Sequence, residues 1–466
     1  MRDPIVIIGG GLAGMATALA LAEAGEKPVL LETRRRLGGR ATSFVDRRTG
    51  QVLDNCQHVL MGGCTNLIDF YDRLGVASMI RWHRTLTWTS GNGVFERVTP
   101  SWLPAPAHLA PAFGRLRLYD AAARRAIRRG VWRILRLGRS GRVAWQDRTF
   151  AEFLATCDQP ADVVRRFWNT IVVSACNLPV ERVAADAALK VFQEGFLANR
   201  FAAALGVPTV PLDDLYAAAP AVIEGAGGVV RSGVAARAIA YDGNRVSGVV
   251  TNEGLVKAYA VVAAVPFDRL DKLVSDTLRA ADPRLQPLGR FEVSPIIAAH
   301  LVFETPIMEM PHLVLVDHDF DWIFEKGRTG AGGQHIQLVK SAADAWIDEP
   351  ETTITQRAVA DVHRAFPAAR GREPVGTRVI KEKRATFACT PEIGVHRPRT
   401  TASGVGVGGG GVPNLFLAGD WCDTGWPATM EGAVRSGYAA AAALSDGCAG
   451  VIEDAPIAPV ARWLGL

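Results

Sequence analysis

The sequence predicts an α/β fold in which a Rossmann-like, doubly wound parallel sheet is interrupted by a second domain of mixed helices and strands. Three observations lead to this expectation. A strand, a glycine turn and a helix occupy the first 25 residues, and a strand–glycine–helix pattern recurs near residues 415–444. The stretches between them mix helical and strand periodicity. At 466 residues, two domains are the natural expectation.

The N-terminal segment has the order of parts that binds a dinucleotide. An apolar strand at 5–8 precedes three glycines at the GxGxxG spacing, a helix at 15–24 follows, and a strand at 28–31 ends at a glutamate. The glycines allow a tight turn, close approach to a pyrophosphate and close helix packing, and the helix N-terminus attracts phosphate. The glutamate can accept hydrogen bonds from a ribose. We expect the dinucleotide to contact Gly9, Gly11, Leu12, Ala13, Gly14, Glu32 and Thr33.

Two further motifs narrow the cofactor. The LGGR sequence at 37–40 follows the first unit closely, and a strand at 415–418 leads into a Gly-Asp pair and a helix at 429–444. This three-part pattern resembles the flavin-dependent amine oxidase and phytoene desaturase superfamily, which implies FAD. The resemblance assigns contacts with FAD to Gly39, Arg40, Gly419, Asp420, Thr429 and Met430. The sequence has no second strand–GxGxxG–helix unit, so we expect no separate nicotinamide domain.

Four blocks, at 53–76, 167–196, 208–216 and 419–437, together are similar to the hydroxysqualene dehydroxylase family. The resemblance runs along nearly the whole chain. It implies reductive removal of the allylic hydroxyl of hydroxysqualene to give squalene, in squalene and hopanoid biosynthesis, with electrons from an external donor. Two alternatives use the same scaffold: an oxidative carotenoid or phytoene desaturase, and a prenyl-binding protein without flavin, similar to the Rab GDP dissociation inhibitors. The LGGR and Gly-Asp-Trp motifs argue against the second alternative.

The FAD-binding domain must be assembled from separated segments. We expect it to comprise residues 1–75, 224–285 and 405–450, with short strands at 229–231, 235–241, 246–251 and 261–265. The superfamily resemblance places Val234 against the adenine. The substrate domain would comprise residues 76–223, which are mostly helical, and 286–404. The second of these stretches has strand patterns at 296–303, 313–316 and 335–339 and a helix at 353–365.

Removing a hydroxyl requires an acid, and two residues are candidates. His58 titrates near neutral pH, and the resemblance places its loop close to the flavin. Its alternative role is that of a capping or core histidine. Asp423 lies between two tryptophans, whose apolar surroundings would raise the pKa of the carboxyl; its alternative role is to cap a turn. We expect substrate contacts from Gln57, Asn169, Asn177, Trp421 and Trp426, although helix capping explains Asn177 equally well.

The net charge of +5 is unevenly distributed. Residues 115–142 contain ten arginines and one aspartate, a local charge of +9, and the helical pattern at 120–137 places an apolar stripe beside Trp132. A basic amphipathic helix of this kind favours contact with an anionic membrane surface, and a solvated helix paired with acids elsewhere is the alternative. Nucleic-acid binding is not expected, because the remainder of the chain is acidic and lacks a recognised module.

The seven cysteines indicate a reducing compartment. Their number is odd and no CxxC occurs, which argues against a disulfide framework and against a zinc site, so we expect no metal. The sequence has no apolar run of 18 residues, the length that a membrane-spanning helix requires. We therefore expect a cytoplasmic enzyme associated peripherally with the inner membrane.

Overall fold

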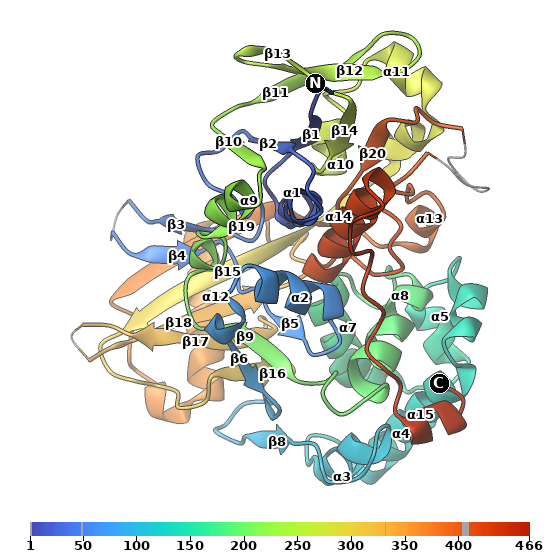
Figure 1. The fold of residues 1–466 in the computed structure, drawn as a ribbon. Helices are drawn as coiled ribbons and strands as arrows, with labels where there is room; N and C mark the ends of the chain where they lie inside the picture. Colours follow the sequence, from blue (N-terminus) through green and yellow to red (C-terminus); the bar gives the residue numbers. More distant parts are fainter. Residues whose placement is uncertain (1, 48–49, 331, 403–409) are drawn as a thin grey trace.

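The apolar strand near the N-terminus forms the centre of a five-stranded parallel sheet. In this computed structural model, which describes residues 2–47, 50–330, 332–402 and 410–466, the strand order is β10-β2-β1-β14-β20. The strands are β10 (Val229–Ser232), β2 (Pro28–Glu32), β1 (Ile5–Ile8), β14 (Ala260–Ala263) and β20 (Leu415–Leu417), and every pair is parallel. The predicted α/β class is confirmed (Figure 1).

Successive side chains of β1 point to opposite faces of the sheet and pack into two different hydrophobic cores. Ile5 and Ile7 face a helical layer of α1 (Leu12–Glu23), α9 (Ala219–Gly225) and α14 (Met430–Leu444). Val6 and Ile8 face the opposite side, where they share a core with Ile239 of an antiparallel β-meander. The meander contains β11 (Ala236–Tyr241), β12 (Val246–Thr251) and β13 (Gly254–Lys257). Because both faces are covered, a continuous apolar strand such as β1 is stable at this position.

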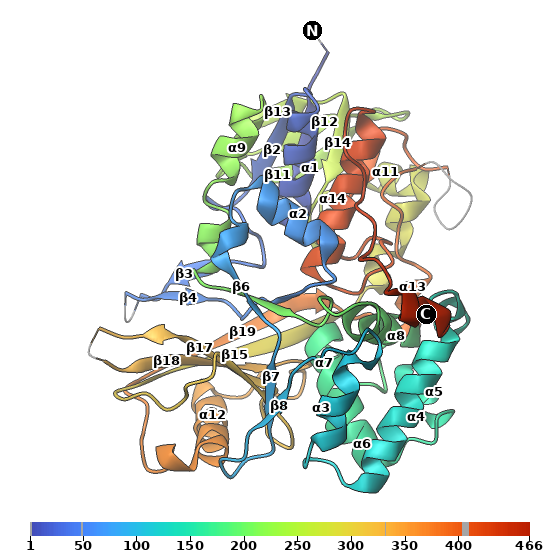
Figure 2. The same cartoon turned by 60° about the horizontal axis from the view of Figure 1, so that its bottom comes forward.

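A seven-stranded mixed sheet forms the second layer of the molecule (Figure 2). Its order is β19 (Gly376–Phe387), β15 (Val293–Phe303), β18 (Gln334–Lys340), β17 (Trp322–Arg328), β16 (His312–Leu315), β7 (Leu86–Thr89) and β8 (Glu96–Val98). The pair β16–β7 is parallel and the other pairs are antiparallel. Helix α12 (Glu351–Ala365) packs on one face through Ile354 and Val362. On the other face, Ala298 and Val339 contact Cys56 of the loop after β4.

Helices from the first long insertion lie beside this sheet. They are α3 (Ala110–Arg115), α4 (Ala121–Leu137), α5 (Phe150–Ala155), α6 (Ala161–Val163), α7 (Asn169–Cys176) and α8 (Ala185–Lys190), with π-helical turns η4 (Val164–Trp168) and η5 (Val191–Leu197). An aromatic cluster holds them together: the Phe150 ring stacks on Phe153 and Phe192, and Trp168 meets Phe192 edge-on. Helix α15 (Pro459–Trp463) returns to this region and packs against the end of α4.

Shorter elements connect the two layers. The strands are β3 (Ser43–Val45), β4 (Val52–Asp54), β5 (Leu60–Met61), β6 (Ile80–His83) and β9 (Leu205–Pro208), and the remaining α-helices are α2 (Thr65–Arg73), α10 (Phe267–Leu270), α11 (Asp276–Ala281) and α13 (Pro391–Gly394). The 3-10 turns are η1 (Ala77–Met79), η2 (Ala107–Leu109), η3 (Ser140–Trp145), η6 (Leu212–Leu215), η7 (Pro283–Arg290) and η8 (Pro367–Ala369).

Two strands of the seven-stranded sheet, β17 and β19, were not predicted from the sequence. Their polar outer faces interrupt the apolar runs that the prediction used. The predicted boundary at residue 405 falls within 403–409, which lie outside the described residues.

All seven cysteines are free. Within the described part of the chain, no helix is long and apolar enough to cross a bilayer, and no cluster of side chains could hold a metal ion.

The apolar stripe of the basic helix packs on the rest of the protein. Helix α4 begins where predicted, with the Asp120 side chain accepting a hydrogen bond from the Ala123 amide at 2.7 Å. Ile127 and Ile134, however, are buried against the aromatic core. The stripe was predicted from spacing alone, which cannot distinguish a face that packs on the protein from one that meets lipid. The exposed face carries arginines and the half-exposed Trp132.

A fully buried ion pair anchors the edge strand β20. The Arg284 guanidinium donates to Asp282, to the Thr400 carbonyl and to the Leu415 carbonyl, and Asp282 also accepts from the Val412 amide. Both side chains have no exposed surface. The pair therefore ties the start of β20 to the turn η7.

We expect Asp282→Ala to lower the free energy of unfolding by about 3–5 kcal/mol, because it leaves the Arg284 charge buried without a partner. The double variant Asp282→Ala/Arg284→Met removes both charges and should lose less than the single variant. Thermal and urea unfolding of the three proteins measure this difference. A double variant less stable than Asp282→Ala would contradict the interpretation.

Candidate functional site

Backbone contacts between β1 and α1 form the first part of the site. Gly9 has φ +106°, and a Cβ there would lie 2.5 Å from the Ala264 carbonyl oxygen. A Cβ on Gly14 would lie 1.9 Å from the Gly9 carbonyl oxygen, so only glycine lets the helix approach the turn this closely. Gly11 is the N-cap of α1 and provides no capping side chain. The first amides of the helix are therefore available to an anionic ligand.

The Glu32 carboxylate joins β2 to this turn. One oxygen accepts the Gly10 amide and the other accepts the Arg34 amide, each at 2.7 Å. Glu32 and Thr33 both line a cavity, and the remaining lone pairs of the carboxylate can accept a ribose hydroxyl. Val234 is buried beside this strand and donates its amide to the Glu32 carbonyl at 2.9 Å. Its neighbour Ala235 lines the cavity, whereas Val234 itself is not among the lining residues.

A second glycine loop touches the first. Gly39 has φ +64°, and a Cβ there would lie 3.1 Å from the Cα of Gly11, so a larger residue would separate the two loops. Arg40 follows and donates to the Asp420 carboxylate at 2.5 Å and to the Ala385 carbonyl at 3.0 Å. Burial lowers the pKa of Arg40, but the adjacent Asp420 carboxylate outweighs burial and the pKa is raised overall. The guanidinium is therefore a permanent cation at this position.

The segment from the end of β20 to the start of α14 lines the cavity beside Arg40. Gly419 follows β20, and a Cβ there would meet the Trp421 indole nitrogen at 2.5 Å. Thr429 caps α14 by accepting the Gly432 amide at 3.1 Å, and Met430 is the first residue of the helix. The helix N-terminus therefore points its free amides toward the cavity that Gly419, Asp420, Thr429 and Met430 line.

The cavity has a volume of about 1120 Å³ and extends from the glycine loops to the helices of the first insertion. Typical small-molecule pockets are about 300–1,000 Å³, so this one has room for more than one ligand. Its distal walls are predominantly apolar: Leu60, Met61, Leu67, Leu86, Trp88, Ile171, Val191, Phe196, Leu205, Ile296, Val314, Trp322, Trp421 and Trp426.

His58 lines the cavity, but its environment differs from the expected one. Its Nδ1 lies 3.1 Å from the Cys56 carbonyl oxygen, so Nδ1 carries the hydrogen and donates it. Burial lowers the pKa of the imidazole, which keeps the ring neutral at neutral pH and leaves Nε2 as an acceptor. The expectation that His58 donates a proton to the substrate stays a prediction, which this neutral ring does not favour.

Buried polar groups hold the loop that carries His58. The Lys326 ammonium donates to the Asp54 carboxylate at 2.7 Å and to the Gln57 side-chain oxygen at 2.8 Å. Burial raises the pKa of Asp54, but Lys326 and other hydrogen-bond donors more than offset it, and the pKa is lowered overall. His300 supports the loop from β15 by donating to the Asp54 carbonyl at 3.1 Å. Gln57 lines the cavity with its orientation fixed by Lys326.

The other predicted residues divide into those that reach the cavity and those that do not. Asp423 is exposed and is not a lining residue, so it does not have the aromatic surroundings that the sequence suggested. Asn169 accepts the Val180 amide at 3.1 Å and does not line the cavity. Neither residue is therefore among those that line the cavity, and their roles in the reaction stay predictions.

Asn177 lies at the cavity wall, but its side chain is already engaged. Its amide donates to the Ser294 carbonyl at 3.0 Å and to Thr386 at 2.9 Å, and its oxygen accepts the Ala342 amide at 2.7 Å. The residue has φ +54° at the end of α7, which favours asparagine. Asn177 therefore has a structural role. Trp421 and Trp426 both line the cavity.

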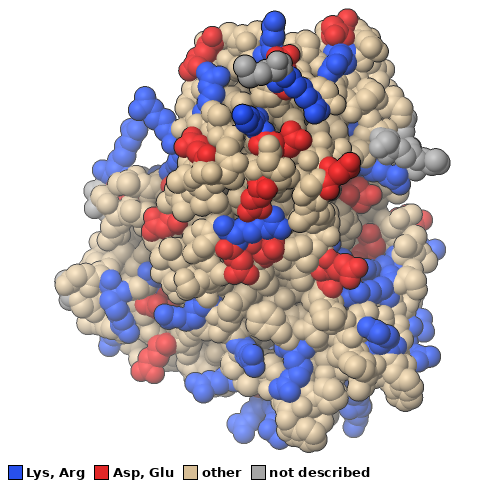
Figure 3. All heavy atoms as spheres, viewed as in Figure 1, with Lys and Arg blue, Asp and Glu red and all other residues tan. Residues whose placement is uncertain are grey.

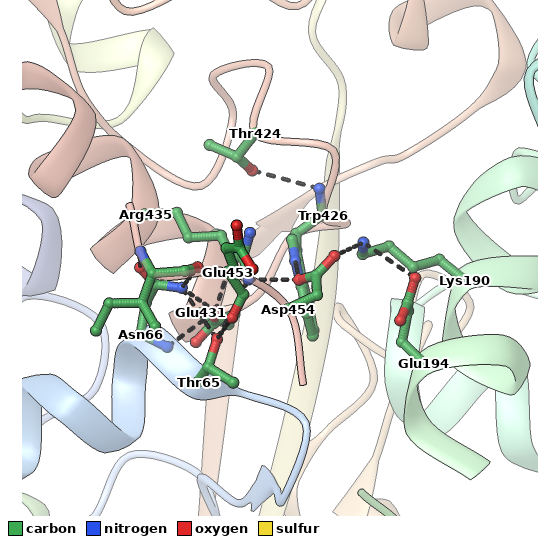
Figure 4. A network of polar contacts seen from close by, with 12 residues as sticks. Thr65, Asn66, Lys190, Glu194, Thr424, Trp426, Glu431, Arg435, Glu453 and Asp454 are labelled. Carbon is green, nitrogen blue, oxygen red and sulfur yellow. Dashed lines mark hydrogen bonds and ion pairs between the residues drawn. The ribbon is translucent and has the colours of Figure 1, made fainter. Parts of the chain in front are cut away.

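The sequence prediction missed a charged network in the cavity wall (Figure 4). It links Lys190 and Glu194 of the first insertion to Arg435 of α14 and to Asp454 of the C-terminal segment. Glu431 extends it by accepting hydrogen bonds from the start of α2. The available signal was a lysine and a glutamate four residues apart within the stretch 187–197, in which Gln193 is the only other polar residue.

Comparison with known proteins shows which protein family this chain resembles. Residues 12–445 match the model of the family described as flavin containing amine oxidoreductase. A hydroxysqualene dehydroxylase from Sinorhizobium fredii is 29% identical over 95% of this chain and 98% of its own. A 15-cis-phytoene desaturase from Synechococcus elongatus is 22% identical over 94% of this chain and 95% of its own.

Solved structures share the fold. A putrescine oxidase has a TM-score of 0.70 at 16% identity, with 95% of this chain and 99% of the other covered. The cyclohexylamine oxidase from Brevibacterium oxydans has a TM-score of 0.66 at 17% identity, with 96% and 99% covered. The family model over residues 12–445 agrees with the glycine loops and with the glutamate at the end of β2: this chain belongs to the flavin-containing amine oxidoreductase family and is an FAD-dependent oxidoreductase.

Proposed function

We propose that the protein removes the allylic hydroxyl of hydroxysqualene reductively and releases squalene. The observation that carries this proposal is the large cavity, whose glycine loops suit FAD and whose distal walls are long and apolar. Relatives named hydroxysqualene dehydroxylase, at 25–29% identity over at least 93% of this chain, support the same substrate class. Apolar side chains predominate in the distal part, as a substrate with one hydroxyl on a C30 hydrocarbon requires.

The residues that line the cavity beside the two glycine loops fit FAD. We assign its ribose to Glu32, its pyrophosphate to the amides after Gly11 and to the second glycine loop with Arg40, and its flavin end to Met430. The remaining contacts are Gly9, Leu12, Ala13, Thr33, Gly39, Gly419, Asp420 and Thr429, and Gly14 acts through helix packing. When bound in its reduced form, FAD supplies hydride. We propose an external two-electron donor as the source of those electrons.

The chain itself supplies orientation and a dry environment. Apolar side chains exclude water from the hydrocarbon, so that developing positive charge on an allylic carbon is not captured by solvent. The neutral His58 offers an acceptor for the hydroxyl hydrogen. Gln57, which Lys326 holds in place, lies on the same loop.

Oxidative desaturation of a carotenoid precursor is the second candidate. Phytoene and ζ-carotene desaturases resemble the chain over 93–94% of its length at 22–25% identity, and their names imply long hydrocarbon substrates. The polar lining of the cavity favours the first candidate. Lys190 and Glu194 line the same cavity as the apolar side chains, and a substrate hydroxyl could form a hydrogen bond there that a pure hydrocarbon cannot form.

We also propose that the exposed face of α4 contacts an anionic bilayer, from which such a substrate must be taken. Arg125, Arg128, Trp132 and Arg136 follow one stripe of the helix, and their side chains are exposed. Arg136 reaches the Leu464 carbonyl, next to Trp463, which is 82% exposed. Figure 3 shows basic side chains gathered at this end of the molecule with few acidic ones among them. Arginines with interfacial tryptophans suit a lipid headgroup region.

Glu32→Ala should weaken FAD binding by about 1.5–3 kcal/mol, because a charged hydrogen-bond acceptor is lost beside the ribose. Equilibrium titration of the deflavinated protein with FAD measures the change, and Glu304→Ala, an exposed residue at the end of β15, serves as the control. Undiminished affinity in Glu32→Ala would contradict the ribose assignment.

The direction of the reaction is tested under anaerobic conditions. Addition of hydroxysqualene to the photoreduced holoenzyme should reoxidise the flavin and produce one squalene per flavin. Deuterium placed at the flavin N5 should appear on an allylic carbon of the product. Desaturation of phytoene by the oxidised enzyme, without reaction of hydroxysqualene, would establish the second candidate instead.

Membrane contact is tested with vesicles containing phosphatidylserine. Arg125→Gln/Arg128→Gln/Trp132→Ala should reduce vesicle binding, because each basic residue near the surface contributes about 1 kcal/mol. Binding of the parent should also fall as salt rises. This variant spares Arg124 and Arg129, which donate to backbone carbonyls of the protein. Lys27→Gln/Lys257→Gln, on the opposite domain, is the matched control, and equal binding by both variants would refute the contact.

A further inference from the structure

The charged network in the cavity wall contains more cations than carboxylates. Arg139 and Arg142 both pair with Glu194, and Arg435 pairs with both Glu431 and Asp454. Lys190 is the fourth cation of this set, against three carboxylates. Each carboxylate therefore already has an arginine partner, and Lys190 brings the surplus charge.

Lys190 is held more loosely than the arginines. Its Nζ lies 3.4 Å from the Asp454 carboxylate and 3.9 Å from that of Glu194, and it sits 4.7 Å from the centre of the Trp426 ring. Figure 4 shows the ammonium between these two carboxylates, reaching across from its helix. An ammonium has three hydrogens, and the one hydrogen bond found for it among the described residues goes to Asp454.

The position of Lys190 relative to the cavity distinguishes it from the other cations there. The residue lines the cavity, although its side chain is only 8% exposed. The other cations that line the cavity all lie outside the first insertion: Arg34, Arg36, Arg40, Arg237, Arg269, Lys272 and Arg384. Of the described lining residues from the first insertion, Lys190 is the only cation, and its ammonium lies over the Trp426 ring.

We propose that Lys190 is a catalytic residue that binds the hydroxyl of the substrate and protonates it as it leaves. This inference rests on the proposed function. In this step an N–H bond of Lys190 breaks as an O–H bond forms, and the C–O bond breaks with its electron pair leaving on water. The allylic carbon receives the hydride that reduced FAD supplies, so two electrons pass from cofactor to carbon. Lys190 then regains its proton from solvent.

The electrostatics of the network favour this transfer. Burial lowers the pKa of Lys190, and the nearby Arg142 and Arg435 act in the same direction, whereas Asp454 and Glu194 raise it; the pKa is lowered overall. Loss of one proton leaves three cations against three carboxylates. The network therefore becomes balanced when Lys190 gives up its proton. Arginine cannot act in this way, because its guanidinium does not deprotonate in proteins.

Two variants separate binding from proton donation. Lys190→Met removes both, and Lys190→Arg retains a cation that holds the hydroxyl but cannot transfer a proton. The carboxylates keep their arginine partners in either variant, so both should retain FAD and the parental melting temperature. Lys383→Met, which removes an exposed lysine on β19, is the matched control.

The first experiment measures binding and does not depend on turnover. Oxidised holoenzyme is titrated with hydroxysqualene and with squalene in detergent, followed by the flavin difference spectrum. The parent, Lys383→Met and Lys190→Arg should prefer hydroxysqualene, and Lys190→Met should lose this preference. A parent without the preference, or a Lys190→Met protein that keeps it, would overturn the inference.

The second experiment measures flavin reoxidation by hydroxysqualene in photoreduced enzyme. Both Lys190 variants should be slower by about 10²–10⁴-fold, the usual contribution of a general acid. The parental rate should fall as pH rises through the pKa of Lys190, and the variants should lack this dependence. The allylic acetate ester, whose leaving group needs no proton, should restore much of the rate in Lys190→Met. Parental rates in both variants would overturn the assignment, whereas a parent that does not react refutes the proposed function itself.

Discussion

The arrangement depends on one constraint: the two glycine loops must touch. The Cα of Gly11 and the backbone of Gly39 approach so closely that a side chain on Gly39 would press on the first loop. This contact can form only if β1 and β2 are adjacent and parallel, which the buried alternation of Ile5 and Ile7 with Val6 and Ile8 secures. Ligands of open parallel sheets bind at the carboxyl ends of the strands, and every FAD residue proposed here lies at or close to such an end.

The other walls of the cavity are formed by elements that lie far apart in the sequence and meet at this edge of the parallel sheet. Arg40 and Asp420 are 380 residues apart and form one ion pair. The face of the seven-stranded sheet opposite α12 supports the His58 loop through Cys56 and His300. A cofactor site, a polar loop and an apolar chamber thus share one cavity because two differently built sheets face each other across it (Figure 2).

Local signals in the sequence predicted what depends on local geometry. The strand–glycine–helix unit, the strand pattern at 296–303 and the basic helix all occur where the sequence placed them. The orientation of side chains could not be predicted in the same way. Ile127 faces the aromatic core and Asp423 faces solvent, because both orientations depend on how distant parts of the chain pack. The His58 ring donates to a carbonyl only two residues away, which depends on the conformation of its loop. Lys190 and Asp454 are 264 residues apart, and no spacing rule connects them.

The order in which the chain is synthesised gives the C-terminal segment a further meaning. Strand β20, the cap at Thr429 and the carboxylate of Asp454 all come from the last tenth or so of the sequence, and Asp454 lies beyond residues 12–445 that match the family. During translation the N-terminal β–α–β unit emerges first but lacks the opposite wall of its own cofactor site. A ribosome-bound chain therefore cannot close around FAD until β20 and the start of α14 have been made. Cofactor loading thus follows synthesis of this C-terminal wall, and the apolar chamber closes only after Asp454 has joined the charged network.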